Sequence, residues 1–76
     1  MKALLIKIVQ ALVDNPEQVQ ITEIEGSQTT VLELRVAKED MGMVIGKQGK
    51  TVNAIRVLLN AASGKAGKRH VLEIVE

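Results

Sequence analysis

The sequence contains no cysteine and no Phe, Tyr or Trp. Without cysteine, the chain can form neither a disulfide frame nor a thiolate metal site. Without aromatic side chains, it lacks the stacking platforms on which many single-strand binders hold nucleic-acid bases. If the protein binds RNA or DNA, the bases must therefore rest on aliphatic side chains.

Acidic residues are missing from one long segment of the chain. Residues 41–72 contain six basic side chains and no carboxylate, whereas residues 1–40 contain four basic and seven acidic ones. In a chain of net charge +1, this distribution predicts a footprint for a polyanion, the alternative being an ordinary solvated surface. We favour the footprint because the segment also contains a glycine turn, where backbone N–H groups bind anions.

Signals for secretion or membrane insertion are also missing. The apolar opening, MKALLIKIVQALV, carries Lys7 inside it and has no small-residue cleavage site. Its apolar residues recur at helical spacing and the run is too short to span a bilayer, which predicts an amphipathic core helix. With 76 residues, of which 46% are apolar, we expect a single domain over residues 1–76, located in the cytoplasm and not bound to a membrane.

Apolar periodicity and turn residues predict the element order α-β-β-α-α-β. We expect a helix over residues 2–13, strands over 18–25 and around 31–36, a short helix over 41–45 capped by Asp40, a helix from 50 to about 62, and a strand over 70–75. Gly26-Ser27 is the expected hairpin turn, and Ser63-Gly64 is expected to end the second long helix. Residues 64–68 would then be a flexible basic loop.

This order predicts an α+β fold with a three-stranded mixed sheet. The tight hairpin makes the first two strands antiparallel. A right-handed crossover through two helices makes the last strand parallel to the second one. Because so short a chain has apolar surface for only two layers, all helices are expected on one face of the sheet.

The glycine turn GKQGKT, residues 46–51, looks at first like the end of a nucleotide-binding P-loop. The spacing excludes that interpretation, because the first glycine of a P-loop would stand at position 44, which is valine. The two glycines instead predict a sharp turn whose backbone is open to close approach, leading into a helix N-terminus that favours negative charge. Flanked by Lys47 and Lys50, the turn suits a phosphodiester backbone passing over it.

The segment VIGKQGKTVNAIR, set between two helices in this element order, resembles the KH domain in its type II, bacterial arrangement, over essentially the whole chain. The short length and the DNPEQV segment are similar to the small single-KH bacterial RNA-binding proteins of the KhpA type. The resemblance implies that the turn clamps the backbone of about four single-stranded nucleotides. It also implies an aliphatic groove with Val44 and Ile45 in one wall and the strand around 31–36 in the other, closed by a variable loop over 63–68.

The RNA contacts implied by the resemblance come from the turn, its flanks and the basic residues beyond it: Val44, Ile45, Gly46, Lys47, Gln48, Gly49, Lys50, Thr51, Arg56, Lys65, Lys68 and Arg69. Simpler roles remain open for some of them. Val44 and Ile45 would also suit the core, which is the favoured place for Val52 and Ile55. Arg56 would equally suit a surface ion pair.

The expected function is single-stranded RNA binding, as an RNA chaperone or a post-transcriptional regulator. His70 has no second His or Cys at metal spacing and no serine has a base nearby, so no enzyme activity, metal or cofactor is expected. The alternative function is an assembly module. The resemblance implies a homodimer, a heterodimer with a larger KH-containing protein of the KhpB or Jag type, or both, and a second copy would also supply avidity.

Overall fold

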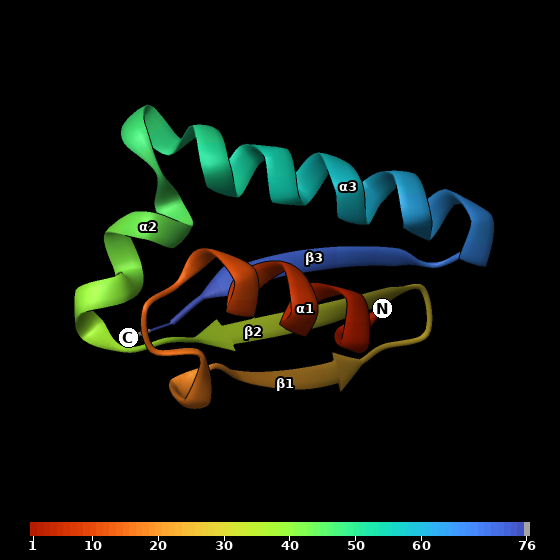
Figure 1. Ribbon diagram of the computed structural model, residues 1–76. Coiled ribbons are helices and arrows are strands. Elements are labelled where there is room, and N and C mark those ends of the chain that lie inside the picture. Colours follow the sequence, from red (N-terminus) through yellow and green to blue (C-terminus); the bar gives the residue numbers. More distant parts are fainter. Residues whose placement is uncertain (76) are drawn as a thin grey trace.

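The computed structural model describes residues 1–75, apart from the side chains of residues 65 and 66. The elements are α1 (Lys2–Leu12), η1 (Pro16–Gln18), β1 (Gln20–Glu25), β2 (Thr29–Arg35), η2 (Lys38–Asp40), α2 (Met41–Ile45), η3 (Lys47–Gly49), α3 (Lys50–Ala66) and β3 (Arg69–Ile74), where η marks a short 3-10 helix. The predicted α+β class and the order of helices and strands are confirmed (Figure 1).

The three strands form one mixed sheet in the order β1-β2-β3. β1 pairs antiparallel with β2, so that Ile24 lies opposite Val31. β2 pairs parallel with β3, so that Leu32 lies opposite Leu72, as the right-handed crossover predicts. β2 is therefore the central strand, and β1 and β3 are the two edges.

The core lies between the helices and one face of the sheet. Leu32 and Leu34 of β2 are completely buried, whereas Glu33 between them is only half-buried, which is the alternation of a sheet covered on one side. In Figure 1, α3 runs along β3 and α1 lies over the strands. One cluster contains all of the following: Leu5, Val9, Val13, Ile21, Leu32, Leu34, Val44, Val52, Ile55, Leu59 and Leu72.

The predicted end of the second long helix is wrong. α3 continues through Ser63 and Gly64 and ends at Gly67, which has the left-handed conformation (φ 72°) of a helix C-terminus. Ser63 fits inside the helix because its buried hydroxyl donates a hydrogen bond of 2.7 Å to the Leu59 carbonyl, one turn earlier. Only Gly67 and Lys68 separate α3 from β3, so the flexible loop expected at 64–68 is mostly helix.

The predicted cap of α2 is also wrong. Asp40 occupies the N-cap position, but its side chain makes no capping hydrogen bond. Its fully buried carboxylate instead accepts hydrogen bonds from the backbone N–H groups of Asn15 (2.9 Å) and Asp14 (3.3 Å) and from Asn15 Nδ2 (3.1 Å). Asp40 therefore ties the segment that follows α1 to the start of α2.

Candidate nucleic-acid interface

The turn between α2 and α3 has an unusual backbone. Gly46 (φ 76°, ψ 169°), Gln48 (φ 59°) and Gly49 (φ 74°) all have positive φ, and the turn projects from the corner where the two helices meet (Figure 1). A Cβ on Gly46 would lie 2.6 Å from the Thr51 Cβ, whereas one on Gly49 would meet only Asn53 Nδ2, at 3.9 Å. Gly46 is thus required for packing on α3, and Gly49 for its left-handed conformation alone.

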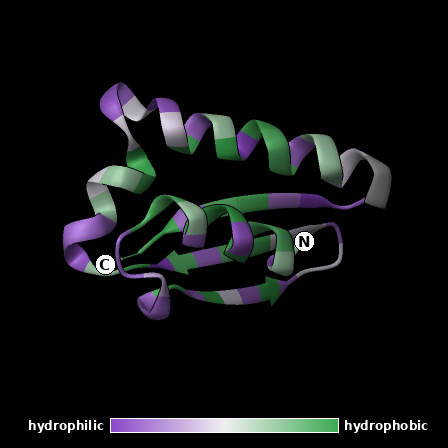
Figure 2. Cartoon of the chain, in the orientation of Figure 1, coloured by the Kyte–Doolittle hydropathy of each residue, from purple (hydrophilic) through white to green (hydrophobic). Residues whose placement is uncertain are grey.

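This turn presents hydrogen-bond donors that the chain does not use. The N–H of Gly46 donates to the Gly42 carbonyl and that of Gly49 to the Gly46 carbonyl, but those of Lys47 and Gln48 have no partner in residues 1–75. Lys47 and Gln48 are exposed, and the first turn of α3 contains no acidic residue. The corner is hydrophilic in Figure 2. Free N–H groups, a helix N-terminus and lysine side chains together favour an anion.

A hollow of about 290 Å³ lies beyond the turn, between α3 and β3. Its lining comes from one side of α3 and from β3: Arg56, Leu59, Asn60, Arg69, His70, Val71 and Leu72. A second hollow, of about 470 Å³, shares Asn60 and Arg69 with the first and continues around the end of α3. Because they adjoin at these residues, the two hollows form one trough, in which aliphatic side chains line the first hollow and cations line both.

The strand beside this trough has a free edge. The N–H of Arg69 donates to the Gln28 carbonyl at the start of the β2–β3 ladder. Because backbone groups of a strand point alternately to its two sides, the N–H and C=O groups of His70 and Leu72 point away from β2. They offer donors and acceptors beside an apolar surface, which is an arrangement suited to the edge of a nucleic-acid base.

Two of the elements expected in the walls of the groove do not border the trough. Val44 is completely buried in the core and lines no surface, because it faces inward from α2. The strand around 31–36 does not border the trough either, since β2 is central and β3 lines the trough. Ile45 is 39% exposed next to the turn, as a wall residue would be, and Val52 and Ile55 are core residues, as favoured from the sequence.

Four of the predicted basic residues lie exposed along the turn and the trough. They are Lys47, Lys50, Arg56 and Arg69. In the described part of the chain, none of these four forms an ion pair with a carboxylate. The alternative role of Arg56 in a surface ion pair therefore has no partner among residues 1–75. Their charges are available to a ligand.

The remaining predicted contacts have other surroundings. Lys68 Nζ lies 3.7 Å from the carboxylate of Glu25, so its charge is partly engaged. Thr51 is half-buried and packs closely against Gly46, on the α3 side of the turn. The side chain of Lys65 is outside the described residues.

Sequence reasoning missed Asn60 and the free edge of β3. Asn60 lines both hollows and stands one turn after Arg56, on the polar side of α3, which is the signal that could have identified it. The free edge of β3 could have been identified only from the strand order β1-β2-β3, which leaves one side of β3 unpaired.

Among residues 1–75, no group of three or more His, Asp or Glu side chains is arranged to hold a metal ion. No helix described there combines the length and the apolar character that a membrane crossing requires.

Comparisons with known proteins identify the family. The family model described as KhpA/KhpB, KH domain, matches residues 2–74. The RNA-binding protein KhpA of Clostridium acetobutylicum is 53% identical over 75 residues, covering 99% of this chain and 100% of that protein. The protein of the same name from Aquifex aeolicus is 55% identical over 65 residues, covering 86% of this chain and 82% of that protein. The one from Chlamydia pneumoniae is 47% identical over 76 residues, covering 100% of this chain and 97% of that protein. The resemblance predicted from the sequence is confirmed: the chain belongs to the KhpA/KhpB KH-domain family.

Proposed function

We propose that the protein binds single-stranded RNA in the cytoplasm, along a groove that begins at the turn over residues 46–49 and follows α3 to the free edge of β3. One observation carries the proposal. The free N–H groups of Lys47 and Gln48 lie in a turn whose lysines pair with no carboxylate of residues 1–75, and α3, which begins at this turn, lines the trough further along. The relatives from Clostridium acetobutylicum and Aquifex aeolicus are named RNA-binding proteins, which supports RNA as the polyanion.

The dimensions of the groove suit a short stretch of RNA. From Gly49 to Asn60, α3 rises about 16 Å at 1.5 Å per residue, which leaves room for only a few nucleotides. The backbone of the RNA would lie over the turn and its bases would face Ile45 and the aliphatic part of the trough. Backbone contacts and aliphatic packing give little sequence selectivity, so only contacts of base edges with β3 would add any. This low selectivity agrees with a role as an RNA chaperone or a post-transcriptional regulator.

The experiment replaces Lys47 and Gln48 together by Asp and measures the affinity for a short single-stranded RNA. We expect a loss of about ten- to a hundredfold, because the change puts two carboxylates where phosphate would lie. A matched control, Lys7→Asp with Gln18→Asp, makes the same change of charge at exposed positions on α1 and η1. The control is expected to lose no more than about threefold, and both variants should keep the circular dichroism of the parent. Equal losses in the two variants would count against the turn as the binding site.

An assembly role is the second candidate, and exposed apolar residues on α3 favour it. Val57 is 66% and Leu58 is 53% exposed, and the exposed Ala54 and Ala61 complete a stripe at i, i+3, i+4 and i+7. Such a stripe fits a second copy of the chain, or the KH domain of a larger partner of the KhpB or Jag type. The small alanines would let two helices approach closely.

Light scattering after size-exclusion chromatography tests the assembly candidate. Leu58→Lys should convert a dimer into a monomer while circular dichroism remains unchanged, since the side chain contributes little to the core of one copy. Lys7→Asp on α1 serves as the control. A dimer that survives the Leu58 change would exclude this stripe as the contact.

A further inference from the structure

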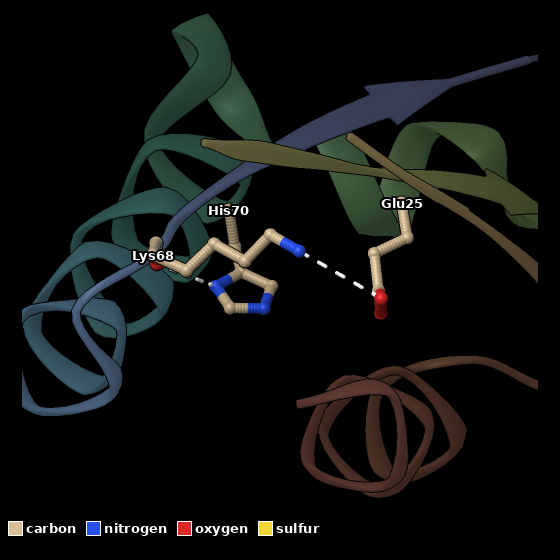
Figure 3. A network of polar contacts seen from close by, with 3 residues as sticks. All are labelled: Glu25, Lys68 and His70. Carbon is tan, nitrogen blue, oxygen red and sulfur yellow. Dashed lines mark hydrogen bonds and ion pairs between the residues drawn. The ribbon is translucent and has the colours of Figure 1, made fainter. Parts of the chain in front are cut away.

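His70 makes a set of contacts that RNA binding as described above does not use. Its half-buried side chain reaches back from β3 toward α3 and lies beside Lys68, whose Nζ is 3.7 Å from the carboxylate of Glu25 (Figure 3). The Nδ1 atom is 2.8 Å from Ser63 Oγ and 3.1 Å from the carbonyl oxygen of Lys68. One ring nitrogen therefore contacts both the last buried turn of α3 and the connection between α3 and β3.

The neighbouring groups fix where the proton of the ring lies. The Lys68 carbonyl can only accept, so its contact with Nδ1 requires a proton on Nδ1. Ser63 has one hydroxyl proton and donates it to the Leu59 carbonyl at 2.7 Å, so its oxygen offers Nδ1 a lone pair. Both contacts are satisfied when Nδ1–H donates to both oxygens. The neutral Nδ1–H tautomer and the protonated ring both fulfil this condition.

These hydrogen bonds lie at the end of the trough. In the middle of the trough, the packing of Leu59 and Leu72 in the core sets the distance between α3 and β3. Beyond Leu59, the pair of Ser63 and His70 connects the two elements. The ion pair of Lys68 with Glu25 adds little, because Glu25 is 70% exposed.

We propose that His70 is a positioning residue for RNA binding. By donating Nδ1–H to Ser63 and Lys68, it fixes the separation of α3 and β3 where Asn60 and Arg69 line both hollows. The backbone of His70 itself faces the trough, so a shift of its side chain would move the strand edge as well. This inference rests on the proposed function, because it concerns the shape of the same groove.

The test compares two substitutions of His70 that differ in one donor. The Nδ2 of asparagine stands as many bonds from the backbone as Nδ1 of histidine, so His70→Asn keeps the donor, whereas His70→Ala removes it. We expect RNA to bind about three- to tenfold more weakly to His70→Ala and within about twofold of the parent affinity to His70→Asn. Parent affinity in the alanine variant, or equal losses in both variants, would overturn the proposal.

A second variant, an NMR measurement and the affinity of the parent protein complete the test. If His70→Ala does not fold, Ser63→Ala removes the acceptor on α3 and is expected to weaken binding by about two- to fivefold; unchanged affinity would overturn the proposal. The ¹⁵N shifts of the imidazole at neutral pH should show a protonated Nδ1, and a protonated Nε2 with a bare Nδ1 would contradict it. If the parent protein binds no RNA, the proposed function fails. If the Lys47 and Gln48 variant loses binding while His70→Ala keeps the parent affinity, only the role of His70 is overturned.

Discussion

Replacing Asp40 by alanine should destabilise the protein strongly. The carboxylate is completely buried and accepts three hydrogen bonds, two of them from the backbone N–H groups of Asp14 and Asn15. A hydrogen bond to a charged group contributes about 1.5–3 kcal/mol, although water can partly replace the long contact to the exposed Asp14. We therefore expect a loss of about 2–4 kcal/mol, which is a large part of the roughly 4–11 kcal/mol typical of a chain this long.

Urea unfolding followed by circular dichroism measures this loss, because the chain has no Trp or Tyr to report by fluorescence. Glu39→Ala is the matched control. Its carboxylate also accepts from Asn15 Nδ2, at 3.3 Å, but on the surface, so a loss below about 0.5 kcal/mol is expected. Asp40→Asn should fall between the two, because it keeps one acceptor oxygen. An Asp40→Ala variant as stable as the Glu39→Ala control would refute the structural role of this carboxylate.

Two more predictions concern the glycines and the charges. Gly46→Ala should lower the free energy of unfolding, measured in urea, by about 2–3 kcal/mol, because a Cβ there meets Thr51 and the backbone conformation belongs almost only to glycine. Gly42→Ala should raise it by about 0.5–1 kcal/mol, because Gly42 lies in α2 with open space around its Cβ position. If Gly46→Ala were the more stable of the two variants, the turn would have another conformation. The affinity for single-stranded RNA should fall with salt at a log–log slope of about −2 to −3 for three or four phosphate contacts, which is a loss of roughly 20- to 50-fold between about 50 and 200 mM. A flat titration would contradict the polyanion footprint.

The regular elements were predictable because local signals and the fold agree there. The apolar spacing of residues 2–12 specifies α1, and glycine at position 46 ends α2 at the predicted residue. The parallel pairing of β2 and β3 follows from the crossover alone. In these places no tertiary contact competes with the local preference.

The errors lie where tertiary contacts decide. Ser63 and Gly64 look like a helix end, but the hydroxyl of Ser63 finds partners in Leu59 and His70, so α3 continues. Aspartate is a residue type that often caps helices, but the carboxylate of Asp40 accepts a hydrogen bond from the backbone N–H of Asn15 instead. Val44 and Ile45 are adjacent apolar residues on a short helix, and only packing shows that the first is core and the second surface.

The most direct test of the central claim is an NMR titration of the ¹⁵N-labelled protein with a short single-stranded RNA. The account predicts that the largest amide shifts fall on residues 46–50 and on the lining of the trough, with the N–H groups of Lys47 and Gln48 moving most. Shifts confined to the outer face of the sheet around Val31, or to α1, with the amides of the turn unchanged, would contradict it.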